Sequence, residues 1–362
     1  MKIDSIQTDC YRIPLPVVLS DATHGDMEAF ELITVRVRDA DGAEGLGYTY
    51  TVGKGGGAIR DLIRRDLAPG LLGEDPRRIE RLWERMWWQL HYVGRGGIAS
   101  FAISAVDVAL WDLAGKRAEE PLWRLLGGVN PQVKAYAGGI DLDFPLDKLQ
   151  AQTQENLERG FRAIKMKVGR DRLREDVERV AALRKLLGPD IPLMVDANMR
   201  WSVEQSIRAA KAFAPHDVFW LEEPIIPDDV AGHVRIAQEG GLPLATGENL
   251  HSLYEFRAII ETGAVAFPEP DVSNCGGITI WRKVAALAEA HNLPVTTHGV
   301  HDLHVHLLAS VPNASYLEAH GFGLERFLAH PMKIVEGLAT APDRPGHGVA
   351  LDWQSLQSLR MD

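Results

Sequence analysis

Short apolar runs alternate with amphipathic stretches from Val133 onward, and this repeat limits the possible folds more than any other feature of the sequence. Such alternation is typical of successive βα units, which build a parallel sheet. Helical periodicity separates several of the runs, over residues 173–187, 203–213 and 280–290. Eight runs qualify as candidate strands: residues 133–137, 163–168, 193–195, 218–221, 244–246, 264–267, 295–297 and 316–317. Eight strands in this length favour a (β/α) barrel, although periodicity alone leaves a doubly wound sheet open.

The segment before this repeat has a different pattern. β-Branched alternation predicts strands over residues 3–13 and 32–38, and Asp39-Ala40-Asp41-Gly42 is a hairpin turn signal. Apolar spacings of three and four predict helices over residues 58–88 and 98–118, before a Gly127-Gly128 stop signal. We therefore expect an α+β domain over residues 1–125 and a barrel over residues 126–321. The turn-rich stretch from about 322 to 362 is expected to return to the first domain.

Charge and cysteine content argue against several classes of protein. The chain has 362 residues, and its 46% hydrophobic content is enough for a large packed core. Its net charge of -11, from 39 basic and 50 acidic residues, argues against nucleic-acid binding. Cys10 and Cys275 indicate neither a disulfide framework nor a thiolate zinc site. Because the sequence shows neither a signal-type N-terminus nor about 18 uninterrupted apolar residues, we expect a cytoplasmic protein outside membranes.

Polar residues stand where the apolar runs stop. They are Lys165, Lys167, Asp196, Asn198, Glu222, Glu248, Asp271, His298 and Glu318. In a parallel barrel the carboxyl ends of all strands lie on one face, so these side chains are expected to converge on one pocket. The spacing supports this, since 26 residues separate Asp196 from Glu222 and Glu222 from Glu248, about one βα unit each.

Three of these residues predict a metal site. Carboxylates from successive strands, Asp196, Glu222 and Glu248, form an all-oxygen ligand set of the kind that Mg²⁺ prefers. The alternative is that they are helix N-caps or ordinary ion-pair partners. That alternative explains any one of them well, but it does not explain three in register.

Two further groups suggest acid and base chemistry. Lys165 and Lys167 lie on the same side of one predicted strand, and each is expected to lower the other's pKa towards neutrality, as a general base requires. Asp271 and His298 end neighbouring predicted strands, where a carboxylate would fix the imidazole tautomer and raise its basicity. A solvated strand end is the alternative for the lysines, and a structural role is the alternative for the histidine.

The motifs that hold these residues resemble the mandelate racemase subgroup of the enolase superfamily. They are Lys-x-Lys, Asp-Ala-Asn, Leu-Glu-Glu-Pro, Gly-Glu-Asn, Pro-Asp followed by Gly-Gly, Thr-His, Tyr-Leu-Glu and the stretch Ser104-Ala105-Val106-Asp107-Val108-Ala109-Leu110-Trp111-Asp112. The resemblance implies an α/β fold in which a modified (β/α)7β TIM-like barrel is closed by an α+β capping domain, residues 1–125 plus about 322–362. It also implies a homo-oligomer and a small-molecule hydroxy acid substrate.

The resemblance further implies a role for each residue at the strand ends. Lys167 would be a base and Lys165 its electrostatic neighbour, and His298 with Asp271 would form the opposing dyad. Glu318 would hydrogen-bond the substrate carboxylate and the enolate, and Asn198 would line the site. Enolase-superfamily sites use such bases with Mg²⁺ to form an ene-diolate. Muconate-lactonising relatives carry a lysine on the sixth strand that residues 271–275 lack, which points away from their racemisations, epimerisations and cycloisomerisations.

The expected reaction is the Mg²⁺-dependent dehydration of an acid sugar, an aldonate or aldarate, to a 2-keto-3-deoxy acid. If His298 instead returned a proton to the other face, the enzyme would be a racemase or epimerase. Similarity to talarate/galactarate dehydratases favours dehydration, and it lies in residues 47–50, 54–57, 93–97 and 304–307. His24, Lys54 and Arg95 are candidates for binding hydroxyls or a distal carboxylate, with solvated charges on mobile loops as the alternative.

A different class of enzyme is suggested by the run of histidines His298, His301, His304 and His306, because histidine-rich stretches bind zinc in hydrolases. Barrel metallohydrolases place paired histidines on the first strand, and residues 134–138 contain none. We therefore expect the extra histidines to line the site or to pack in the core.

Overall fold

Three antiparallel strands open the chain: β1 (Ile3–Asp21), β2 (Gly25–Asp39) and β3 (Glu44–Thr51). The computed structural model describes residues 2–320 and 322–362. The hairpin turn predicted between β2 and β3 is confirmed, since Gly42 has a φ of 90° and the Asp39 N–H donates to the Ala43 carbonyl at 3.0 Å. The pairing of β1 with β2 slips in register between Pro14 and Leu19, so β1 bulges there.

Helices follow this sheet and pack against it. They are α1 (Gly56–Leu62), a π-helical turn (Ile63–Leu67), α2 (Ala68–Leu71), α3 (Ile79–Leu90), α4 (Ile98–Ala118) and α5 (Leu122–Leu125). The long α4 lies directly on β3, because Gly47 has no side chain and a Cβ there would clash with the Ala105 carbonyl. In length and hydropathy α4 could cross a membrane, but 78% of its apolar window is buried inside this layer.

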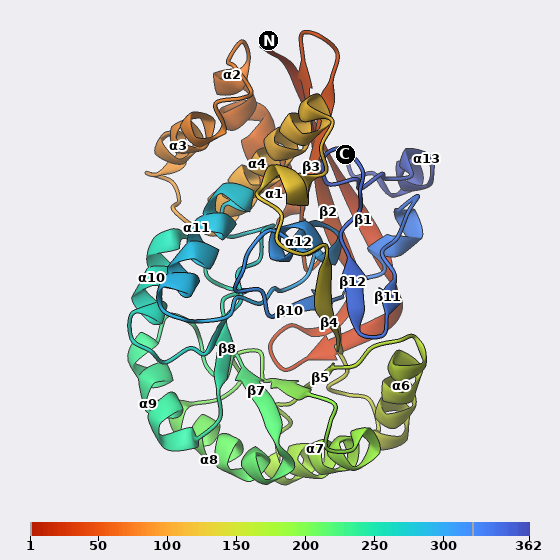
Figure 1. Ribbon diagram of the computed structural model, residues 1–362, viewed down its shortest axis with the longest axis vertical. Helices are drawn as coiled ribbons and strands as arrows, with labels where there is room; N and C mark the ends of the chain where they lie inside the picture. Colours follow the sequence, from red (N-terminus) through yellow and green to blue (C-terminus); the bar gives the residue numbers. More distant parts are fainter. Residues whose placement is uncertain (1, 321) are drawn as a thin grey trace.

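A barrel occupies the second part of the chain, in the lower part of Figure 1, and the red hairpin of β1 and β2 reaches down beside its strands. Its strands are β4 (Gln132–Gly138), β5 (Ile164–Lys167), β6 (Leu193–Asp196), β7 (Val218–Glu222), β8 (Leu244–Thr246), β9 (Phe267–Pro268) and β10 (Tyr316–Ala319). Its helices are α6 (Leu146–Glu158), α7 (Leu173–Leu187), α8 (Val203–Phe213), α9 (Val230–Gly240), α10 (Leu253–Ile260), α11 (Gly277–Ala290) and α12 (His301–Leu308). Helices α6 to α10 form an arc outside the strands (Figure 1).

Only part of the seventh predicted strand forms. Residues 295–297 make a single bridge, Val295 to Ala314, instead of a ladder. The Thr296 N–H still donates to the Pro268 carbonyl of β9 at 3.0 Å, and the Ser315 N–H donates to the Val295 carbonyl at 2.8 Å. Because β10 then pairs in parallel with β4, these bonds complete the ring. The predicted α/β fold, a modified barrel with a capping layer, is confirmed.

The C-terminal stretch contacts both parts of the molecule. Strands β11 (Ile334–Val335) and β12 (Leu338–Thr340) add an antiparallel hairpin to β4 of the barrel. Beyond α13 (Trp353–Leu356), Arg360 pairs with Asp9 of β1 at 2.7 Å, and the Met361 N–H donates to the Cys10 carbonyl. The chain end therefore ties the first sheet to the barrel.

One face of α4 explains the helical motif found in the sequence. Asp107 is fully buried and accepts hydrogen bonds from the Thr279 N–H at 2.9 Å and the Thr279 hydroxyl at 2.6 Å. Helix α11 begins after Gly276, which has no side chain to cap the helix. Asp107 of α4 therefore acts as the N-cap by accepting from the free backbone N–H of Thr279. Ser104 on the same face accepts from the Gly276 N–H at 2.9 Å. The motif therefore joins the capping layer to the barrel.

Removing this cap should destabilise the whole molecule. We expect Asp107→Ala to lower the free energy of unfolding by about 2–4 kcal/mol, because buried N–H and hydroxyl donors lose their acceptor. Urea unfolding followed by circular dichroism measures the change. The control is Asp190→Ala at an exposed carboxylate, expected to stay within about 0.5 kcal/mol of wild type. Equal stability of the two variants would show that Asp107 does not join the layers.

Candidate active site

The barrel register places charged side chains next to one another at the strand ends. Lys167 of β5 is the direct partner of Asp196 of β6, and Asp196 is the direct partner of Glu222 of β7. Glu248 follows β8 by two residues, and all three carboxylates are buried. Parallel pairing thus brings together side chains about 26 residues apart, as the spacing predicted.

The three carboxylates could hold a divalent cation. Asp196, Glu222 and Glu248 each offer an oxygen, and these atoms lie within 4.8 Å of one another. Oε2 of Glu248 is buried and makes no hydrogen bond to any described residue, and its ion-pair contact is with Nε2 of His298 at 3.4 Å. Burial and the neighbouring carboxylate charges, despite Lys165, raise the pKa of Glu222 well above its ordinary value. A bound Mg²⁺ would relieve both costs, so the ligand set fits the ion.

Both lysines are buried and paired with these carboxylates. Lys165 contacts Glu222 and lies 2.8 Å from Oε1 of Glu318, while Lys167 contacts Asp196. Burial and the charge of Lys165 lower the pKa of Lys167. The charges of Asp196, Glu248 and Glu222 have a larger effect in the opposite direction, so the net pKa is raised. Lys165 does lower the pKa of Lys167, as predicted, but the net pKa does not move towards neutrality for the side chains alone, because carboxylates outnumber lysines. The positive charge of bound Mg²⁺ would act in the opposite direction.

His298 and Asp271 form the dyad that their positions predicted. Nδ1 of His298 lies 3.0 Å from Oδ2 of Asp271, and Nε2 lies 3.4 Å from Oε2 of Glu248. Burial lowers the pKa of His298, but the charge of Glu248, the hydrogen bond that the imidazole donates to Asp271 and the charge of Glu318 together raise it to about 10. The dyad thus contacts Glu248 while Lys167 contacts Asp196, so the two proton-transfer groups meet different members of the carboxylate triad.

Glu318 is an acceptor in this arrangement. It accepts hydrogen bonds from Lys165 and, at 2.8 Å, from the Gly299 N–H. Burial raises its pKa, but Lys165 and His298 reverse this and the net pKa lies below the ordinary value. The resemblance implies a hydrogen bond from Glu318 to the substrate carboxylate. As donor of that bond, Glu318 would need a proton, whereas its lowered pKa favours the ionised form.

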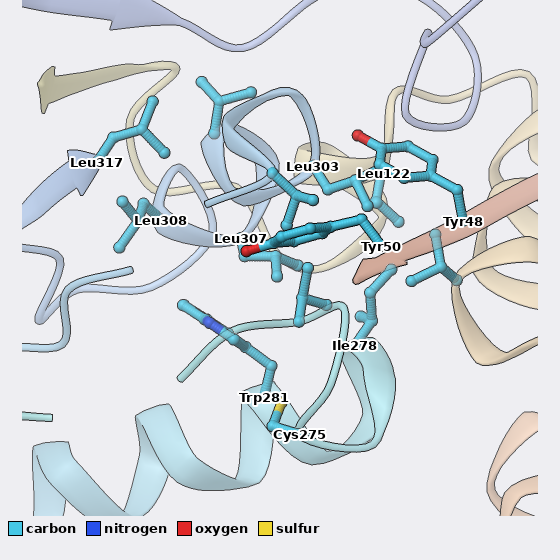
Figure 2. Close-up of a cluster of buried hydrophobic side chains, with 14 of the residues drawn as sticks. Tyr48, Tyr50, Leu122, Cys275, Ile278, Trp281, Leu303, Leu307, Leu308 and Leu317 are labelled. Carbon is cyan, nitrogen blue, oxygen red and sulfur yellow. The ribbon is translucent and has the colours of Figure 1, made fainter. Parts of the chain in front are cut away.

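Tyr50 of β3 extends from the capping layer to the dyad, and the sequence analysis did not select it. Its hydroxyl lies 3.3 Å from Oδ2 of Asp271 and 3.4 Å from Nδ1 of His298. The ring packs within a cluster that includes Leu303 and Leu307, shown in Figure 2. Burial and the Asp271 charge raise the pKa of Tyr50 well above its ordinary value, so the phenol remains a donor. No sequence pattern marks such a contact, because its partner lies 221 residues away.

The hairpin loop between β1 and β2 covers the β5 and β6 ends. The Thr23 hydroxyl donates to the Asn198 carbonyl, and Oδ1 of Asn198 is buried without a partner in the described part of the chain. His24 pairs with Asp21 at 2.8 Å. The hydrogen bond that its imidazole donates to Asp21 raises the pKa of His24 against its burial, and the charge of Glu248 raises it further. The structure therefore brings His24 and Asn198 to the candidate site.

Lys54 and Arg95 are not brought to the carboxylates. Lys54 is exposed in the turn before α1 and forms no ion pair with any described residue. Arg95 lines a separate hollow of about 680 Å³ with Trp83, Trp87 and His251, and neither the metal-site carboxylates nor the bases line it. A substrate-binding role for either residue gains no support from these positions.

The histidine run has two structural members. Nε2 of His304 accepts from the Val272 N–H at 2.9 Å, and Nδ1 donates to the Gly299 carbonyl at 2.8 Å. His306 bonds the backbone of Trp123 and His347. Burial lowers the pKa of His304 to about 4 and that of His306 to about 3, so both are neutral. Since their nitrogens bond the backbone, these two histidines do not form the zinc site of a hydrolase.

Glu269 is a further buried acid that was not among the candidate residues predicted from the sequence. It stands two residues before Asp271, and both of its carboxylate oxygens are buried without a hydrogen-bond partner among the described residues. Burial and then the charge of Glu222 raise its pKa well above the ordinary value. The only available signal was an acid between the prolines of Pro268-Glu269-Pro270, and that pattern does not indicate burial.

The capped barrel and its carboxylate triad define an enzyme of the enolase superfamily. The pattern of the mandelate racemase / muconate lactonizing enzyme N-terminal domain matches residues 5–127, and that of the enolase C-terminal domain-like family matches residues 148–355. Together with the relatives described next, these matches show that the chain belongs to the mandelate racemase subgroup of that superfamily.

Three relatives illustrate the range of activities nearby. A 3,6-anhydro-alpha-L-galactonate cycloisomerase from Streptomyces coelicolor is 59% identical over 357 residues, 99% of each chain. The crystal structure of a racemase from Streptomyces coelicolor A3(2) with bound magnesium is 58% identical, with a TM-score of 0.97 over 99% of this chain and 100% of that one. An L-talarate dehydratase from Polaromonas sp. JS666, complexed with Mg and L-glucarate, is 36% identical, with a TM-score of 0.94 over 100% and 98%.

The relatives confirm Mg²⁺ as the cofactor, since two of these structures contain it and the triad is suited to it. They also correct one expectation. The missing lysine on the sixth strand pointed away from cycloisomerisations, yet a cycloisomerase shares 59% identity over nearly the whole chain. The absence of that lysine therefore does not separate this chain from every kind of cycloisomerase.

Loss of one triad carboxylate should weaken Mg²⁺ binding. We expect Glu248→Gln to raise the Kd for Mg²⁺ at least about tenfold, because a charged ligand is replaced by a neutral amide. Isothermal titration calorimetry measures the change. The matched control is Glu261→Gln on the exposed end of α10, where the carboxylate pairs with Arg257. Unchanged affinity in Glu248→Gln would remove Glu248 from the metal site.

The Tyr50 hydroxyl should matter only through the dyad. We expect Tyr50→Phe to lower kcat about tenfold, because Asp271 loses a donor that helps to position it. Tyr48 on the same strand is the control, since its buried hydroxyl has no partner among the described residues and Tyr48→Phe should stay within about twofold of wild type. The Tyr50 effect should disappear in a His298→Asn background. An effect that persists there would indicate a general structural role.

Proposed function

We propose that the protein catalyses β-elimination from a sugar-derived 2-hydroxy acid, and that 3,6-anhydro-α-L-galactonate is its substrate. The observation that carries the proposal is the placement of two proton-transfer groups on one carboxylate triad. Lys167 contacts Asp196, and His298 contacts Glu248 at 3.4 Å. An acid and a base held around one cation site can act on two atoms of the same substrate.

The proposed reaction begins with removal of the proton at C2, next to the carboxylate. Either Lys167 or the His298 dyad accepts this proton, and the electron pair of the broken C–H bond forms a double bond between C1 and C2, which places negative charge on the carboxylate oxygens. Mg²⁺ bound by Asp196, Glu222 and Glu248 supplies positive charge beside the substrate carboxylate. Lys165 adds a buried ammonium group where negative charge develops on that carboxylate.

In the second step the carboxylate re-forms, the electron pair moves from between C1 and C2 to form a double bond between C2 and C3, and the bond between C3 and its oxygen breaks. The other proton-transfer group donates a proton to this oxygen as it leaves, and the resulting enol becomes a 2-keto-3-deoxy acid. If the oxygen is a free hydroxyl, water leaves and the reaction is a dehydration. If the oxygen belongs to a 3,6-anhydro ring, the ring opens, no atoms are lost and the product is an isomer of the substrate. One site can therefore serve both reactions, and the substrate decides between them.

The choice of the anhydro acid rests on relatedness. The cycloisomerase that is 59% identical is named for this compound, whereas the talarate dehydratase is 36% identical. Dehydration of an acid sugar, the outcome that sequence analysis favoured, involves the same bond changes and is the second candidate. Racemisation or epimerisation of a 2-hydroxy acid is the third, because one base could remove the proton and the other could return it, and a relative 58% identical is described as a racemase.

Product mass distinguishes these candidates. With Mg²⁺ and 3,6-anhydro-L-galactonate, we expect a 2-keto-3-deoxy acid of unchanged mass, detected by mass spectrometry and by trapping of the ketone. Conversion of galactarate or L-talarate with loss of one water, but no action on the anhydro acid, would favour the dehydratase. Inversion at C2 without a ketone product would favour the racemase.

The two bases can be tested in the same assay. We expect Lys167→Ala combined with His298→Asn to slow α-proton exchange in deuterium oxide by about 10²–10⁴-fold, because acid–base groups contribute on this scale. The control is Lys185→Ala at an exposed lysine of α7. Exchange at the wild-type rate in the double variant would overturn the assignment of both bases.

A further inference from the structure

A cavity of about 450 Å³ lies at the carboxyl ends of β4 and β10, beneath the bulge of β1. The bulge residues Pro16, Val17 and Leu19 line it on the capping side, and residues 137–140 line it on the barrel side. The capping and barrel walls are joined directly, since Ser20 forms a parallel bridge with Asp141. The volume is within the range of small-molecule sites.

None of the catalytic groups lines this cavity, but Glu318 lies directly behind its wall at Gly138. A Cβ on Gly138, in the cavity wall, would clash with the Glu318 carboxylate, so the absence of a side chain at this position keeps Glu318 in contact with the wall. Two histidines also line the cavity, His301 three residues after His298 and His320 two residues after Glu318. A substrate held by the catalytic groups can therefore extend into the cavity.

Each of these histidines has a buried ring nitrogen without a partner. Nδ1 of His301 and Nε2 of His320 are inaccessible to solvent and make no hydrogen bond to any residue the structure describes. The nearby His304 and His306 use both ring nitrogens in backbone contacts. An unpaired buried polar atom costs about 1–3 kcal/mol, so two in one cavity indicate that a ligand satisfies them.

The charges of the cavity argue against an anionic group there. The charged lining residues are Glu155, Arg159 and Glu325, so acidic side chains outnumber basic ones. Arg159 is already engaged, because it donates to Oδ1 of Asn156 at 3.3 Å and its guanidinium lies 5.6 Å from the ring centre of Phe161. Burial lowers the pKa of His320 to about 3, which keeps its imidazole neutral. Among the described lining residues a second carboxylate would meet two acidic side chains and one cation, Arg159, whose guanidinium already contacts Asn156 and Phe161.

We propose that His301 and His320 determine specificity by binding the uncharged oxygens, hydroxyl or ring ether, of the distal half of a six-carbon monocarboxylic acid. A neutral imidazole offers one donor and one acceptor, which suits such oxygens. The apolar bulge of β1 covers the carbon skeleton. This inference rests on the proposed function, because it assumes that the carboxylate end of the substrate occupies the metal site.

Binding measured by calorimetry in the presence of Mg²⁺ tests the subsite without requiring turnover. The probes are 3,6-anhydro-L-galactonate, glycerate, which has the same reacting carbons but no distal half, and galactarate, which has a second carboxylate. We expect wild type to bind the anhydro acid at least about tenfold more tightly than galactarate. In His301→Leu and His320→Leu, affinity for the anhydro acid should fall at least about tenfold while that for glycerate stays within about twofold.

Two further variants guard against misfolding. His320→Gln keeps a donor and an acceptor and should recover part of the affinity, and His330→Leu at an exposed histidine should behave as wild type. Equal losses for the anhydro acid and glycerate, no loss for either, or wild-type binding of galactarate as tight as that of the anhydro acid would each overturn the proposal. Failure of the proposed function is a separate result, since it would appear as intact, histidine-dependent binding of the anhydro acid without conversion to a ketone.

Discussion

The repulsion among buried carboxylates at the strand ends is the constraint on which the rest of the site depends. Asp196, Glu222 and Glu248 are held together by the parallel register of β6, β7 and β8, although their charges oppose this arrangement. Lys165 and Lys167 offset part of the repulsion, and a bound divalent cation would offset the rest. The strand ends carry backbone strain as well, since Asn198 and Glu223 both have positive φ angles.

Much of this arrangement could be predicted from the sequence, because parallel strands convert regular spacing into proximity. The spacing of 26 residues located the triad, and apolar periodicity located α7 and α8 at the same bounds that the structure gives. The long α4 was also found at its observed ends. These features depend on interactions within one element or between neighbouring elements, for which periodic patterns are direct evidence.

What could not be predicted depends on contacts between distant segments. Tyr50 meets Asp271 only because the capping sheet lies over the barrel, and Arg95 faces a separate hollow for the same reason. The pKa of Lys167 was predicted from its neighbour Lys165 alone, whereas the charges of Asp196, Glu248 and Glu222 at close range outweigh that neighbour. Strands were also predicted to be longer than they are at two places, since β9 has two residues where the run 264–267 has four, and residues 295–297 make a single bridge.

Two strands of the capping sheet, β3 and β1, differ in how far their sequences can vary. Strand β3 carries Tyr50 to the dyad and packs closely on α4, so its sequence is restricted at both faces. The bulge of β1 interrupts the pairing with β2 and lines the cavity with Pro16, Val17 and Leu19. Substitutions in the bulge therefore leave the contact between Tyr50 and the dyad in place. For protein engineering, the bulge is the segment to exchange between homologues, and β3 is the segment to retain.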